Sequence, residues 1–100
     1  MAQYAEHVCV DPAEIRRLES LVADLQGNGR VSIVLKDGST CEGVVSVRPT
    51  VQVLRDRAGR EGVNAEVRLE RPGEPAWNRS IWLDQVDRVE HLDSILGSES

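Results

Sequence analysis

The sequence predicts an α+β domain, mainly β, in which one N-terminal helix precedes a five-stranded, strongly bent antiparallel small barrel. Apolar residues recur at helical spacing only near the N-terminus, and the spacing changes to every second residue after position 29. From there on, short polar turns separate the apolar segments. The 100 residues have room for a single domain over 1–100, and so small a sheet has to curl to bury its apolar face.

Start and stop signals bound the helix at about 12–26. Asp11 can cap the first turn, Pro12 suits the first helical position, and Glu14 completes a capping box. The stretch Gly27-Asn28-Gly29 should end the helix, because glycine and asparagine tolerate the left-handed conformation of a C-terminal cap. One apolar stripe faces the rest of the domain: Ile15, Leu18, Leu21, Val22 and Leu25.

The barrel is expected over about 30–92. Its first strand leads into Asp37-Gly38, which is typical of a two-residue type I′ hairpin turn with positive φ at both residues. Gly38 is therefore expected to be a structural glycine. Gly43 in the returning strand is a second one, because glycine within a strand permits a sharp bend. The remaining strands are expected at 51–56, 63–70, 77–83 and 87–92, and the tail at 97–100 is expected to fray.

Alternation in the strands and spacing in the helix predict which side chains form the core. Leu18, Leu21 and Leu25 should cover one end of the barrel. The side chains expected to line the barrel are Val31, Ile33, Val45, Val53, Val67 and Leu69.

An ordered set of motifs resembles the first half of an Sm-like domain: Val31-x-Ile33-x-Leu35-Lys36-Asp37-Gly38, Glu42-Gly43-Val44-Val45-x-Val47 and Val51-x-Val53-Leu54. The resemblance covers about two-thirds of the chain and is strongest to small uncharacterised Sm-like proteins of Xanthomonas and its relatives. It implies a short helix before a five-stranded bent barrel of SH3-like size. Typical members bind single-stranded RNA in the pore of a hexameric or heptameric ring.

The residues that bind RNA in typical Sm-like proteins are absent from this sequence. Alignment on Gly43 places the family's Asp, stacking residue and Asn on Pro49, Val51 and Val53, which do not offer a base the same contacts. The family's second motif, an Arg-Gly or Lys-His pair, would fall near 81–84, where the sequence reads Ile-Trp-Leu-Asp. The resemblance therefore implies the fold without the RNA site.

The favoured function is a non-catalytic Sm-like interaction module that binds protein, including a second copy of itself. An open five-stranded barrel leaves two strand edges that can pair with another chain. Trp77 and Trp82 are five residues apart, so they should point to opposite faces of a strand, with one of them exposed as a contact surface. A homodimer or small homo-oligomer is expected.

The alternative is a divergent binder of single-stranded RNA or DNA. The net charge of −5 argues against a generic nucleic-acid binder, yet residues 44–83 carry a local charge of +2. The bent strands could gather four arginines into an anion contact: Arg48, Arg55, Arg57 and Arg60. The same arginines could instead form a salt-bridged surface with neighbouring acidic residues.

Motifs for catalysis, for a cofactor and for a metal are absent. His7 and His91 lie in different elements without ligand spacing, and no phosphate-binding loop or nucleophile motif occurs. Cys9 and Cys41 lack C-x-x-C spacing and are expected to be buried thiols in a reducing cytoplasm. No apolar run could span a membrane, and the first residues do not resemble a signal peptide. These features predict a cytoplasmic protein that is not an enzyme and does not bind a membrane.

Overall fold

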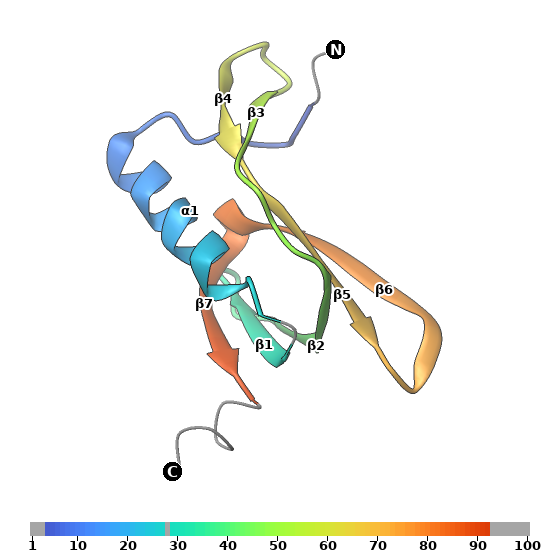
Figure 1. The fold of residues 1–100 in the computed structure, drawn as a ribbon. Coiled ribbons are helices and arrows are strands. Elements are labelled where there is room, and N and C mark those ends of the chain that lie inside the picture. Colours follow the sequence, from blue (N-terminus) through green and yellow to red (C-terminus); the bar gives the residue numbers. More distant parts are fainter. Residues whose placement is uncertain (1–3, 28, 93–100) are drawn as a thin grey trace.

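The computed structural model describes residues 4–27 and 29–92, and the tail expected to fray at 97–100 lies outside them. A helix comes first, strands follow, and one turn of 3-10 helix precedes the last strand (Figure 1). The elements are α1 (Pro12–Asp24), β1 (Arg30–Leu35), β2 (Thr40–Val47), β3 (Gln52–Arg55), β4 (Glu61–Asn64), β5 (Glu66–Arg71), β6 (Glu74–Trp82), η1 (Leu83–Gln85) and β7 (Val86–His91).

The strands form a five-stranded antiparallel sheet in the order β6-β5-β2-β1-β7, together with a separate β3–β4 pair. The predicted fold class, a helix followed by bent antiparallel strands, is thereby confirmed. The expected barrel does not close, however, because β6 and β7 occupy the two edges of the sheet within the described residues. The β3–β4 pair extends away from the rest of the sheet at the top of Figure 1.

The two sheets are parts of one long, bent hairpin. Val47 of β2 lies opposite Arg68 of β5, and the next pair along the hairpin is Gln52 opposite Asn64. The chain advances five residues on one side and four on the other, so the ladder continues across an irregular step. The single strand expected at 63–70 is therefore wrong: it divides at Ala65 into β4 and β5.

The turn between β1 and β2 differs from the expected type. Gly38 has a φ of 92°, whereas no other kind of residue in the described chain has positive φ, so Asp37 does not adopt the left-handed conformation. The Gly38 N–H donates to the Leu35 carbonyl at 2.9 Å, and the Leu35 N–H donates to the Ser39 carbonyl at 2.8 Å. These bonds define a three-residue loop with glycine in the left-handed position instead of a type I′ turn.

The predicted helix start is confirmed, whereas the end differs. The Asp11 carboxylate accepts from the N–H groups of Ala13 at 3.1 Å and Glu14 at 3.3 Å. The helix ends at Asp24, and Leu25 is its C-cap with a φ of −105°. Gly27 does not adopt positive φ, so it does not provide the expected left-handed cap.

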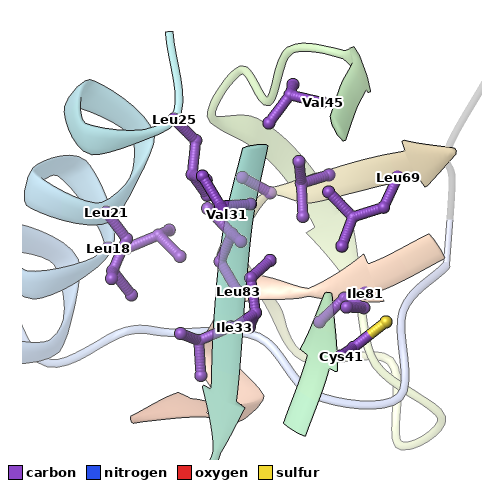
Figure 2. Packing of buried hydrophobic residues seen from close by; sticks show 13 residues of the cluster. Leu18, Leu21, Leu25, Val31, Ile33, Cys41, Val45, Leu69, Ile81 and Leu83 are labelled. Carbon is purple, nitrogen blue, oxygen red and sulfur yellow. The ribbon is translucent and has the colours of Figure 1, made fainter. Parts of the chain in front are cut away.

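The core lies between α1 and the concave side of the sheet. Leu18, Leu21 and Leu25 face Val31 of β1 in Figure 2, as the helical spacing predicts. Of the side chains expected to line the barrel, five are buried: Val31, Ile33, Val45, Val67 and Leu69. The prediction for Val53 is wrong, because 64% of Val53 is exposed while its neighbour Leu54 is only 2% exposed.

The chain before α1 runs along the β3–β4 pair. The Ala5 N–H donates to the Arg55 carbonyl at 3.0 Å, and Cys9 and Val63 exchange two backbone hydrogen bonds of 2.7 and 3.0 Å. Gly62 makes this approach feasible, since a Cβ there would lie 2.8 Å from the Cys9 carbonyl oxygen. The segment 4–9 thus brings His7 and Cys9 against the body of the domain.

Within the described ranges, 4–27 and 29–92, there is no helix long and apolar enough to cross a membrane.

Candidate functional site

Three segments that are distant in the sequence meet at the side chain of Asn64, which is fully buried. Its Nδ2 donates to the His7 carbonyl and to Asp84 Oδ1, both at 2.9 Å. Its Oδ1 accepts from the Ala65 N–H at 2.8 Å, at the point where β4 ends and β5 has not yet begun. We call the set His7, Asn64 and Asp84 the junction.

Asp84 connects the junction to the surface. Its Oδ2 accepts from Gln85 Nε2 at 2.8 Å and lies 3.7 Å from His7 Nδ1. The Asp84 side chain is 13% exposed, whereas that of His7 is 67% exposed. The contact between His7 and Asp84 is therefore screened by solvent and contributes about 0–1 kcal/mol. The hydrogen bond from the buried Asn64 amide holds the Asp84 carboxylate in place.

A cavity of about 240 Å³ opens beside the junction, between the N-terminal segment, α1, the end of β1 and η1. Apolar side chains line part of the cavity: Val8, Cys9, Leu18, Leu21 and Leu83. The polar side chains around it are His7, Glu14, Arg17, Lys36, Asp84 and Gln85. The cavity thus combines an apolar surface with charges of both signs.

The Cys9 thiol in this cavity is held in its neutral form. Burial raises the pKa of Cys9, and the carboxylates of Asp84 and Glu14 raise it further against the smaller opposing effect of Lys36. A neutral thiol is a poor nucleophile and a poor metal ligand. Among the described residues, no three His, Cys, Asp or Glu side chains are grouped as metal ligands would be.

The four arginines expected to form an anion contact are divided by the fold. Arg55, Arg57 and Arg60 are exposed around the turn that joins β3 to β4. Arg48 lies before β3, and the four residues of that strand span about 13 Å. The Asp56 carboxylate is engaged in the turn itself, where it accepts from the Ala58 and Arg60 N–H groups at 2.9 Å.

Neither tryptophan is fully exposed. Trp77 is half-buried against the core, and the guanidinium carbon of Arg71 lies 4.0 Å from its ring centroid. Trp82 is also half-buried, at the end of β6 opposite Glu66. One of the two was expected to be exposed as a contact surface, whereas each is half-buried.

Gly43 lies where β5 and Trp77 leave little room beside β2. A Cβ at this position would lie 2.9 Å from the Glu70 carbonyl oxygen and 3.4 Å from the Trp77 ring. The approach of β5 and of the tryptophan thus provides a physical reason for glycine here, in addition to the bend expected from the sequence.

The three positions that match the Sm-like RNA motif differ in solvent exposure. Pro49 is buried, while Val51 and Val53 are exposed hydrophobic residues. Asp84, at the position of the second motif, belongs to the junction. Sequence reasoning missed the junction, although the polar Asn64 between apolar Val63 and Ala65 was a signal that one buried position was polar.

The outer edge of β6 carries peptide groups without a partner among the described residues. The Leu83 N–H donates to the Ala65 carbonyl at 2.9 Å, which continues the β5–β6 ladder beyond Trp82. Bonding alternates along an antiparallel ladder, so the N–H and C=O groups of Asn78 and Ser80, and the N–H of Trp82, point away from β5. The Trp82 carbonyl is the N-cap acceptor of η1. Pro75, which cannot donate, lies nearer the start of the strand.

The outer edge of β7 is partly covered. The Leu92 N–H donates to the Arg30 carbonyl, and the same alternation directs the peptide groups of Val89 away from β1. The guanidinium of Arg17 on α1 donates to the Asp87 carbonyl. The helix therefore engages one of the groups that a pairing strand would need.

The arrangement of helix, bent sheet and β3–β4 extension is that of an Sm-like variant. The crystal structure of XC5848 from Xanthomonas campestris, which adopts a novel variant of the Sm-like motif, matches with a TM-score of 0.86 and 40% sequence identity. The match covers 92% of this chain and 99% of that chain. The resemblance inferred from the sequence is confirmed.

A model of the family described as a domain of unknown function, DUF3247, matches residues 2–92. The chain belongs to this family. No curated protein matches it.

Proposed function

We propose that the protein is a non-catalytic, cytoplasmic interaction module that binds a second copy of itself through the outer edge of β6. The observation that carries this proposal is the set of uncovered peptide groups of Asn78 and Ser80, together with the Trp82 N–H, at the edge of an open sheet. An exposed strand edge is a template for pairing with another chain. The neutral thiol of Cys9 and the unpaired state of both cysteines support a non-catalytic role in a reducing compartment.

The difference between the two edges favours a two-fold dimer over a ring. A ring requires β6 of one copy to pair with β7 of the next, and Arg17 already occupies the Asp87 carbonyl on β7. Two β6 strands can instead pair antiparallel about Ser80, where the Asn78 carbonyl can accept from the N–H of Trp82 of the partner subunit. The net charge of −5 adds a repulsion that grows with the number of copies.

Light scattering coupled to gel filtration at tens of micromolar tests the proposal. The wild type should have the mass of two chains. Ser80→Pro removes an N–H that points away from β5, so it should give the mass of one chain, whereas Ser80→Thr keeps that N–H and should remain a dimer. Circular dichroism establishes that both variants fold.

A wild-type mass of one chain would rule out self-association. A mass of six or seven chains would show that β6 pairs with β7 in a ring in spite of Arg17.

A second candidate function, the binding of single-stranded RNA or DNA, is favoured by one observation. Arg55, Arg57 and Arg60 are all exposed around one turn, and the nearby Asp56 carboxylate is engaged with backbone N–H groups. Fluorescence anisotropy with a mixed-sequence oligonucleotide at low salt tests it. Binding that weakens steeply with salt and is lost when the three arginines are replaced by glutamine would support this function, and no binding would exclude it.

A further inference from the structure

The cavity beside the junction is small, and its surface is more polar than apolar. Its volume of about 240 Å³ is below the roughly 300–1,000 Å³ of pockets for drug-sized molecules, so it suits a molecule of only a few heavy atoms. Leu18, Leu21 and Leu83 are at most 7% exposed, so their side chains offer little apolar surface to a ligand. A ligand of this cavity therefore has to be small and polar.

Charged side chains of both signs surround the cavity in equal number. Glu14 and Asp84 are its carboxylates, and Arg17 and Lys36 are its cations. Within residues 4–27 and 29–92, no two of these four side chains form an ion pair with each other. The four charges therefore remain available to a ligand, and their balance favours a molecule without net charge over an anion or a cation.

The negative end of the cavity lies toward the N-terminal segment. The carboxylates of Asp84 and Glu14 act on the Cys9 thiol more strongly than the ammonium of Lys36 does. The Asn64 amide holds Asp84 in place, and each of the two Asp84 oxygens accepts a hydrogen bond. A carboxylate has about four acceptor sites, so Asp84 can accept further hydrogen bonds from an ammonium group.

The positive end of the cavity lies toward the start of β7. The backbone N–H of Lys36 donates to the Gln85 carbonyl at 2.9 Å, and the Arg17 guanidinium donates to the Asp87 carbonyl. A guanidinium has five N–H donors, so Arg17 retains donors for a carboxylate. Arg17 follows Glu14 by three residues on α1, which places the two residues about 4.5 Å apart along the helix axis. A short dipolar molecule can span that distance.

We infer that this cavity binds a small zwitterionic amino acid, with its ammonium group at Asp84 and Glu14 and its carboxylate at Lys36 and Arg17. Such a molecule makes charge-assisted hydrogen bonds at both ends of the cavity, whereas an ion of one sign makes them at one end only. Its side chain has to be small, as in glycine or alanine, because the cavity holds few atoms. The site is separate from the β6 edge, so it stands or falls independently of self-association.

An NMR titration of the full chain, labelled with nitrogen-15, tests the inference. The probes are glycine and its two half-molecules, acetate and methylammonium, each up to about 50 mM at constant ionic strength. Glycine should shift the amide signals of Cys9, Lys36 and Gln85 in a saturable manner. Acetate and methylammonium should each bind at least about tenfold more weakly, because each meets only one end of the cavity.

Two variants that remove charges of opposite sign test both ends of the site. Glu14→Gln and Lys36→Gln should each weaken glycine binding by roughly fivefold, because each removes a partner of one charge of the zwitterion. Arg57→Gln, on the β3–β4 turn, is the control and should have no effect. Glutamine can replace glutamate in a capping box, and the amide signals far from the cavity establish that each variant folds.

Three results would overturn the inference. They are binding of acetate or methylammonium that is as tight as that of glycine, an undiminished glycine affinity in either cavity variant, and the absence of saturable shifts around the cavity with glycine.

Discussion

At the scale of single residues, Asn64 connects three segments that are distant in the sequence. One amide group satisfies the His7 carbonyl, the Asp84 carboxylate and the Ala65 N–H, and so joins the N-terminal segment, the β4–β5 step and η1. An apolar side chain at position 64 would leave these three groups without their hydrogen bonds to the amide. Water could not easily replace those bonds, because position 64 is fully buried. The junction therefore depends on this one polar side chain.

Asn64→Ala should lower the free energy of unfolding by about 1–3 kcal/mol, because buried polar groups lose their partners. Urea denaturation measures the change, and Gln52→Ala, at an exposed position outside the β6 edge, is the control with an expected effect below about 0.5 kcal/mol. Equal stability of Asn64→Ala and the wild type would show that the junction contributes nothing to the fold.

Gly43→Ala should destabilise the protein by about 1–3 kcal/mol, since the added methyl would meet the Glu70 carbonyl oxygen. Gly73→Ala is the control, because a Cβ there meets nothing within 4 Å and Gly73 does not have positive φ. Thermal unfolding of the two variants should separate them clearly. If both unfold at the wild-type temperature, β5 is able to move away from β2 at little cost.

The thiols provide a pH-dependent prediction. Burial raises the pKa of Cys9 and of Cys41, so the folded state keeps both protons at a pH where the unfolded chain loses them. Their contribution to stability is complete below the unfolded thiol pKa of about 8.5 and declines as the pH rises above it. Alkylation by iodoacetamide at pH 8 should be slow in the folded protein and fast in urea. Fast alkylation of the folded protein would contradict the burial.

Single residues also show where a sequence pattern is sufficient. Strict alternation located Val67 and Leu69 in the core, because only one phase of that strand is apolar. In the stretch around Val53 and Leu54, adjacent residues are both apolar, so the pattern allowed either to face inward. The structure buries Leu54, and long-range packing decides the choice.

At the scale of elements, α1 is predictable from its own residues, since its cap and its apolar stripe are local signals. The division of the strand at Ala65 is not local. It depends on Asn64 binding a carbonyl from residue 7 and a carboxylate from residue 84, which no short stretch of sequence brings together. The junction and its cavity were unpredictable for the same reason.

Leu21→Ala should lower the free energy of unfolding by about 2–5 kcal/mol, because the side chain is buried between α1 and the sheet. Ser20→Ala, on the exposed face of the same helix, should be nearly neutral. Thermal denaturation compares the two. An unchanged midpoint for Leu21→Ala would mean that the helix is a loosely attached appendage.

At the scale of the whole molecule, the account depends on a sheet that remains open between β6 and β7. The sequence predicted two edges, but it could not show that Arg17 from the helix would engage one of them. This asymmetry separates a two-fold pair from a head-to-tail ring. The central claim is that the β6 edge is where one copy meets another.

Hydrogen exchange of the Ser80 amide, measured by NMR at several protein concentrations, tests that claim most directly. The Ser80 N–H points away from β5, so a hydrogen bond to a second copy should make its exchange slow at high concentration and faster on dilution. The Val89 amide on the outer edge of β7 should exchange rapidly throughout. A Ser80 amide that exchanges as fast as that of Val89 at every concentration would contradict pairing through β6.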